Sequence, residues 1–274
     1  MSETTKAGTI KDIILEVQEL IKEGLIQGYK QNIFFTQNYS DLQSRVIEYL
    51  IVVNVAQKLE HFGIKKSIFI NLEYSLNDFY NNAFPSFIFA GEVFAQEHKS
   101  RKKHSPDDSK SKRIDIALTQ ESRLAGEWFT TQKSFVGIEI KSINQSDKKI
   151  KKDIERMAKA INLKDNIGQN NIQACFACFF KRFDKDNTTL TKPQIEKKTS
   201  AEKKKWEKHF EEIKDTYSDL LFELIDTSIV NMPAEEFNIA PYGDDADYED
   251  LLANTGCINA YIVKITRIEN KSEE

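Results

Sequence analysis

The order of helix-like and strand-like patterns is the feature of this sequence that most restricts how the chain can fold. Between residues 40 and 180, apolar residues recur at helical spacing in two segments and follow strand-like patterns in four others. In chain order these are helix 40–62, strands 67–76, 112–119 and 134–143, helix 147–163 and strand 171–180. This order predicts an α/β fold with a mixed central sheet flanked by helices.

An amphipathic helix is also predicted before these segments, over residues 10–27. Thr9 can cap its first turn, because an acidic residue, Asp12, follows three positions later. Gly28 is expected to end this helix, and Gly63 to end the next one, since glycine favours the position just past a helix.

The chain is predicted to have three parts, which are an N-terminal helical segment (1–39), a core (40–180) and a C-terminal extension that packs on the core (181–274). Within the extension we expect a charged linker at 181–199, a helix at 200–226 and a strand at 258–268. Because that helix is rich in Lys and Glu, His209 within it is expected to face solvent.

The sequence predicts neither export nor a membrane span. No run approaches the roughly 18 apolar residues that a membrane-spanning helix needs. The start of the chain, MSETTKAGTIKD, lacks the apolar core of a signal peptide. A cytoplasmic protein without a membrane partner is therefore expected.

The three cysteines are predicted to be buried, reduced thiols. Cys175 and Cys178 lie in an apolar strand pattern, and residues three apart in a strand point to opposite faces of the sheet. The pair would then not converge on one metal ion. A metal or redox role is the alternative.

Charge is strongly segregated along the chain, although the net charge is only −4. Residues 98–113 carry seven Lys or Arg against two Asp, and residues 141–164 carry eight against three acids. Residues 231–255 carry seven acids and no Lys or Arg. Such segregation is typical of partner-binding surfaces, but solvated helix faces and loops explain each single run equally well.

Two neighbouring strand patterns carry charged residues within apolar sequence. Strand alternation places Asp115 on one face of segment 113–118, and Glu139 and Lys141 on one face of segment 136–143. If the strands are neighbours, two carboxylates and one ammonium converge in a half-buried position. Carboxylates of this kind suit a hard divalent cation such as Mg²⁺ or Mn²⁺. The alternative is an ordinary Glu–Lys ion pair on a solvated sheet face.

The context of Glu139 and Lys141 is more informative than their spacing. A Glu followed two residues later by a Lys occurs six times, with the Glu at positions 97, 139, 196, 202, 212 and 269. Only Glu139 lies within an apolar strand pattern. A second acid, Glu48, interrupts an apolar helical stretch at 46–56, where a carboxylate must be paired, hydrogen-bonded or bound to a metal.

With these residues in this order, the chain resembles the PD-(D/E)XK nuclease superfamily over about residues 40–180. The resemblance implies a restriction-endonuclease-like core and divalent-cation-dependent cleavage of phosphodiester bonds. Asp115 is similar to the first motif acid, Glu139 and Lys141 to the E-x-K pair, and Glu48 to the acid of the first core helix. The family's usual Pro before the Asp is Ile114 here. The Gln-x-x-x-Tyr pattern of RecB-type exonucleases is absent after Lys141.

The function expected from this resemblance is a Mg²⁺-dependent (or Mn²⁺-dependent) DNA endonuclease that acts in defence, restriction or repair. Glu48, Asp115, Glu139 and Lys141 would be catalytic, and the three acids would hold the metal. Backbone phosphates of the nucleic acid are expected to meet basic side chains. These are Lys148, Lys149, Lys152, Arg156, Arg101, Lys102 and Lys103.

Two other functions remain open at the level of sequence. A non-catalytic nucleic-acid-binding or assembly subunit could use the same fold. A structural α/β protein with an ion-pair cluster on its surface would place Glu48 far from Asp115. For an enzyme, the acidic net charge is compatible with a protein partner or a homo-oligomer that gates its activity.

Overall fold

Six strands form one mixed sheet in the computed structural model of the chain. The structure describes residues 9–36, 48–83, 112–123, 130–143, 145–165, 168–183, 190–232 and 256–268. The strands are β1 (Ile68–Ser75), β2 (Arg113–Arg123), β3 (Thr130–Ile143), β6 (Ala174–Arg182), β7 (Leu220–Met232) and β8 (Gly256–Arg267). Their order in the sheet is β1-β2-β3-β6-β8-β7, with β3 and β6 parallel and the other pairs antiparallel.

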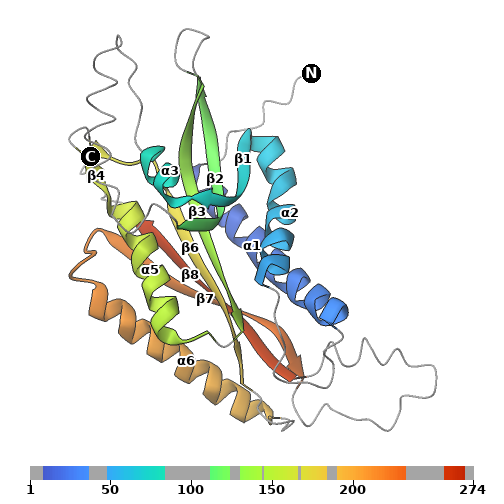
Figure 1. Ribbon diagram of the computed structural model, residues 1–274. Helices are drawn as coiled ribbons and strands as arrows, with labels where there is room; N and C mark the ends of the chain where they lie inside the picture. The colour runs from blue at the N-terminus through green and yellow to red at the C-terminus, as the bar shows by residue number, and fades with distance from the viewer. Residues whose placement is uncertain are drawn as a thin grey trace, which may run out of the picture.

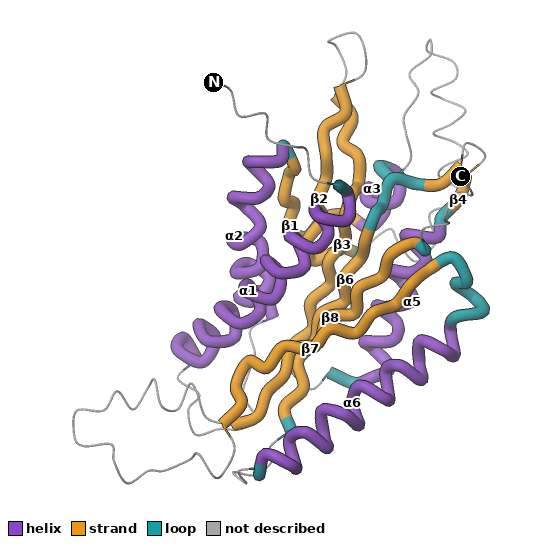
Figure 2. The backbone as a smooth tube through the Cα atoms, turned by 180° about the vertical axis from the view of Figure 1, so that it is seen from behind, coloured by secondary structure: helices purple, strands orange, loops and turns teal. Residues whose placement is uncertain are grey.

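Helices cover both faces of this sheet, as Figures 1 and 2 show from opposite sides. One face packs against α1 (Ile10–Thr36) and α2 (Glu48–Lys66). The other packs against α3 (Leu76–Asn81), α5 (Asp147–Asn162) and α6 (Lys192–Ile213). Two short strands, β4 (Lys164–Asp165) and β5 (Gly168–Gln169), form a separate hairpin. The predicted mixed sheet flanked by helices is therefore confirmed. The core order helix, strand, strand, strand, helix, strand is also present, with α3 and the β4–β5 hairpin inserted into it.

Strand alternation divides the buried side chains between two apolar clusters. Val136, Ile138 and Ile140 of β3 pack toward α1 and α2, whereas Ala117 of β2 packs toward α5. Cys178 lies in the first cluster and Cys175 in the second, so the predicted opposite orientation of the two thiols is confirmed. Both are buried and free. Ile114 departs from the expected alternation, because it packs in the second cluster.

The N-terminal helix begins as predicted but does not end at Gly28. Thr9 and Asp12 form the expected cap, in which the Asp12 N–H donates to Thr9 Oγ1 (3.2 Å) and the Thr9 N–H donates to Asp12 Oδ2 (2.8 Å). The helix then continues to Thr36. Gly24 and Gly28 serve a close helix contact instead, because a Cβ at either position would lie within 3 Å of an α2 backbone atom.

The second helix also continues past its predicted end. Residues 37–47, which include the predicted start at Ser40, lie outside the described part of the chain. From Glu48 the helix runs through Gly63 to Lys66, and the chain turns at Ser67, whose φ is 56°. A Cβ at Gly63 would lie 2.6 Å from the carbonyl oxygen of Ile68, so this glycine permits the close return of β1 rather than the helix end.

The prediction for residues 181–226 was wrong in three respects. The helix α6 begins at Lys192, after a capping box between Thr191 and Gln194, and it ends at Ile213. Residues 220–232, partly assigned to the helix, form strand β7 beside β8. His209 is buried rather than solvated, and its ring lies 6.1 Å from that of Trp206.

Several other sequence predictions lie outside the described residues. They concern the basic segment 98–111 and the acidic stretch 233–255.

The described helices include none that is long and apolar enough to cross a membrane. β7 and β8 join the strands of the core in one continuous sheet.

The contact between α1 and α2 leads to a stability prediction for Gly24→Ala. In an unobstructed helix this change would stabilise the protein by about 0.5–1 kcal/mol. Here the new Cβ would lie 2.5 Å from Val55 Cα, so the helices must move apart. We expect a net loss of about 1–3 kcal/mol in the free energy of unfolding. Denaturant titration measures this loss.

The matched control is Glu16→Ala, at an exposed position on the same helix. We expect it to change the free energy of unfolding by no more than about 0.5 kcal/mol. A stabilising effect of Gly24→Ala would mean that the two helices are not in backbone contact.

Candidate functional site

The candidate site lies where β2 and β3 part. Their paired residues run from Arg123 with Thr130 to Ile116 with Ile138. Asp115 comes one residue past this last pair. Its carboxylate takes the place of a backbone acceptor for β3, because its Oδ2 accepts a hydrogen bond (2.7 Å) from the N–H of Ile140. β3 meanwhile stays paired with β6 on its other side. The divergence leaves room for side chains between the ends of the two strands.

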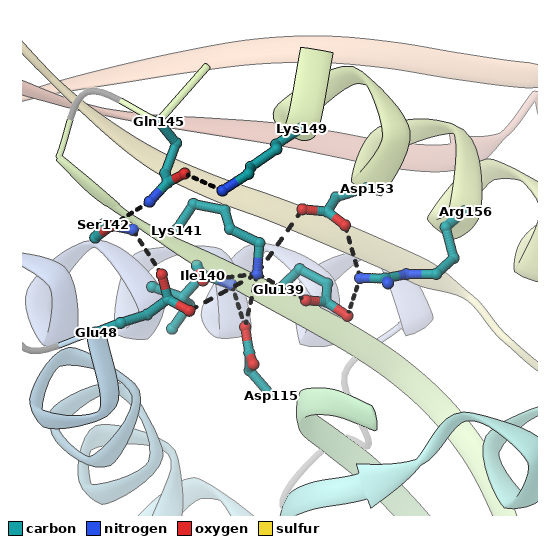
Figure 3. A network of polar contacts seen from close by, with 10 residues as sticks. All are labelled: Glu48, Asp115, Glu139, Ile140, Lys141, Ser142, Gln145, Lys149, Asp153 and Arg156. Atoms are coloured by element: carbon teal, nitrogen blue, oxygen red, sulfur yellow. Dashed lines mark hydrogen bonds and ion pairs between the residues drawn. The ribbon is translucent and has the colours of Figure 1, made fainter. Parts of the chain in front are cut away.

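The side chain of Lys141 occupies the centre of this site (Figure 3). Its Nζ lies 3.4 Å from Glu139 Oε2 and 3.8 Å from Asp115 Oδ2. It also lies 3.9 Å from Glu48 Oε1 and 3.8 Å from Asp153 Oδ2. Four carboxylates from β2, β3, α2 and α5 thus surround a single ammonium group.

Glu48 reaches the site from the first described turn of α2. Its Oε2 accepts a hydrogen bond of 2.9 Å from the backbone N–H of Ser142, which fixes the carboxylate beside β3. Its Oε1 and the Oδ2 of Asp115 both lie within 4 Å of the Lys141 ammonium. The distant Glu48 expected of a purely structural protein is therefore not observed.

Two further charged residues, Asp153 and Arg156, enter the site from α5. Arg156 Nη2 lies 2.6 Å from Glu139 Oε1 and 2.8 Å from Asp153 Oδ1. Asp153 was missed as a site residue because it lies in a Lys-rich segment. It does, however, share the buried stripe of α5 with Ile150, Ile154 and Met157. An acid on the apolar stripe of a helix was the signal that could have identified it.

Burial shifts the protonation equilibria of the site. Glu139 is only 2% exposed, and burial, together with the nearby Asp115, raises its pKa to about 8. Burial also raises the pKa of Asp115, against the opposing effect of Lys141. Burial alone would lower the pKa of Lys141, but the surrounding carboxylates raise it above its ordinary value. The ammonium form of Lys141 is thus favoured.

The donor chemistry and charge of the site fit a divalent cation. Four carboxylates against Lys141 and Arg156 leave a formal excess of two negative charges when all are ionised. The buried oxygens Glu139 Oε1 and Asp153 Oδ2 accept no hydrogen bond from the described residues, and carboxylate oxygens are the ligands that Mg²⁺ prefers. Among the described residues, no three acidic, His or Cys side chains are already gathered around a vacant ion position. The two cationic side chains lie between the acids.

The four residues predicted to be catalytic lie together, and the predicted nucleic-acid contacts are more dispersed. Lys148, Lys149 and Lys152 are exposed on α5. Lys149 donates to Gln145 Oε1 (3.4 Å) at the edge of the site. Arg156 lies inside the site, whereas residues 101–103 lie outside the described part of the chain.

Comparison of the chain with family models, curated proteins and solved structures found no match.

The raised pKa of Glu139 predicts how stability depends on pH. The unfolded chain loses this proton near the ordinary value of 4.5, whereas the folded protein keeps it to about pH 8. The folded state therefore binds more protons between these values, so this group contributes less stability as the pH rises. Relative to Glu139→Gln, the wild type is expected to lose unfolding free energy across this interval. Denaturant titrations at a series of pH values measure the difference.

Glu139→Gln serves as the reference because it keeps the shape of the side chain and removes the titrating proton. Parallel pH profiles for the two proteins would contradict the predicted protonation of Glu139.

Proposed function

We propose that the protein is a nuclease that depends on a divalent cation, Mg²⁺ or Mn²⁺, and hydrolyses phosphodiester bonds. The observation that carries this proposal is the convergence of Asp115, Glu139 and Glu48 on Lys141, with each carboxylate within 4 Å of its Nζ. The same residues carry the resemblance to the PD-(D/E)XK nucleases. We therefore also propose that the α/β core is restriction-endonuclease-like.

Each residue of the site has a distinct role in this proposal. Asp115, Glu139 and Glu48 would hold the cation through carboxylate oxygens. When bound, the cation would polarise the scissile phosphodiester and stabilise the charge that develops on it. Lys141, as an ammonium group, would position the attacking water. The Ile140 N–H orients Asp115, and the Ser142 N–H orients Glu48, which preorganises the acids before substrate arrives.

DNA is the substrate we propose, with internal cleavage in defence, restriction or repair. The exposed Lys148, Lys149 and Lys152 lie on the helix that also supplies Asp153 and Arg156 to the site. Their charges can bind backbone phosphates, which give affinity without sequence information. The acidic net charge of −4 favours a protein partner or self-association that assists binding, and light scattering tests the latter.

The proposal predicts that cleavage requires the clustered residues. Asp115→Ala, Glu139→Ala and Lys141→Ala should each lower cleavage of plasmid DNA by at least about 100-fold, since each removes a group that stabilises the transition state. Cleavage should also disappear when a chelator removes divalent cations. Circular dichroism establishes that each variant is folded.

The chain offers an exact sequence control, because Glu212-Ile213-Lys214 repeats the tripeptide of Glu139 and Lys141 at the end of α6. Lys214→Ala is expected to leave cleavage unchanged. Full cleavage by the Lys141 and Glu139 variants would refute the proposal. DNA binding without cleavage, and without cation binding in calorimetry, would instead identify a non-catalytic binding subunit.

A further inference from the structure

Arg156 lies on an oxygen of the carboxylate that is best placed to bind a cation. Its Nη2 is 2.6 Å from Glu139 Oε1, while Glu139 Oε2 faces Lys141 at 3.4 Å. Both oxygens of Glu139 are therefore occupied by side-chain cations. The contact with Arg156 is close but is not aligned as a hydrogen bond, since no described residue donates a hydrogen bond to Glu139 Oε1.

One donor of Arg156 has no hydrogen-bond partner within the described part of the chain. This donor is Nε, which is buried in a side chain that is 20% exposed. A guanidinium carries five N–H donors in a fixed plane that matches the oxygens of a phosphate. A buried donor without a partner is costly. The guanidinium thus keeps at least one N–H donor, Nε, that the described residues leave without an acceptor.

Asp153 is the second anchor of Arg156. It lies three residues earlier on the same face of α5, and its Oδ1 is 2.8 Å from Arg156 Nη2. Its other oxygen faces Lys141 at 3.8 Å. Asp153 therefore contacts both cationic side chains of the site from one buried position.

We propose that Asp153 is a positioning residue that retains Arg156 in the site, and that Arg156 must release Glu139 before this carboxylate can accept a divalent cation. Once released, Arg156 stays paired with Asp153 and presents its free N–H donors to a phosphate oxygen of the substrate. This inference rests on the proposed nuclease function and adds an exchange step to it. The exchange couples cation binding to the appearance of a phosphate-binding group.

The exchange predicts opposite effects of the two residues on cation affinity, measured by calorimetry with Mn²⁺ alone in alkaline buffer. Arg156→Gln removes the competitor for Glu139, so Mn²⁺ should bind about fivefold tighter or more. Asp153→Asn leaves Glu139 as the only anchor of Arg156, so Mn²⁺ should bind about 10-fold weaker. In the double variant, the Asp153 substitution should have little further effect, because the residue through which it acts is gone.

Lys159→Gln is the matched control for cation binding. It removes the same charge from an exposed position on α5 and is expected to leave Mn²⁺ affinity unchanged. Arg156→Met replaces Arg156→Gln if the latter does not fold. At saturating Mn²⁺, the Arg156→Gln variant should lose about 100-fold in kcat for DNA cleavage despite its tighter cation binding. Arg156→Lys should restore part of this loss.

The outcomes separate this inference from the proposed function. A wild-type protein that neither binds Mn²⁺ nor cleaves DNA overturns the nuclease proposal itself. If the wild type binds Mn²⁺ and cleaves, but Arg156→Gln binds Mn²⁺ no tighter, the exchange is overturned while the nuclease stands. An equal loss from Asp153→Asn with and without Arg156 would also overturn it, since Asp153 would then act on the cation directly.

Discussion

The burial of one carboxylate, that of Glu139, is the constraint around which the site is organised. A carboxylate that is 2% exposed must be compensated by positive charge, by hydrogen bonds or by a proton, because isolated burial of its charge is very costly. Glu139 lies between Ile138 and Ile140 in β3, and both of these side chains face the apolar cluster on the opposite side of the sheet. The hydrophobic alternation of β3 therefore fixes the position of its charged residues.

The elements around Glu139 each supply part of this compensation. Lys141 follows on the same face of the strand, and α5 brings Arg156 against the other carboxylate oxygen. The compensating cations are in turn neutralised by further acids, Asp115 and Asp153 among them. The result is a network in which each ion pair of the site shares a charged side chain with another ion pair. Such networks can exchange partners without exposing a bare charge.

The central strands and the residues on them could be predicted from the sequence, because period-two alternation is a local property. This pattern placed Glu139 and Lys141 opposite Ile138 and Ile140 of β3, whereas the alternation expected around Asp115 fails at Ile114. The convergence of these charged residues with Glu48 follows from strand adjacency and helix packing, and the sequence supported it through the resemblance and element order. The apolar stripe of α5 indicated which face of that helix is buried against the sheet, and Asp153 lies on this face. The position of Asp153 could therefore have been predicted from the stripe.

The errors of sequence reasoning arose where tertiary contacts override local signals. Gly28 has the character of a helix end, yet the helix continues because the glycine lets α2 approach closely. The first residues of β7 were assigned to the preceding helix, because their apolar residues alternate less clearly. In the structure, pairing with β8 stabilises them as a strand. The Lys- and Glu-rich sequence around His209 suggested a solvated side chain, but His209 shares the buried stripe of α6 with Trp206 and Phe210.

The position of β8 between β6 and β7 has a consequence for how the chain matures. β8 follows both neighbours in sequence, so during synthesis the long apolar strand β6 has an unpaired edge until residues 256–267 leave the ribosome. Pairing over such sequence separations is slow, and an open apolar edge is a template for association with other nascent chains. The continuous sheet from β1 to β7 can therefore be completed only when this late strand inserts between its two neighbours.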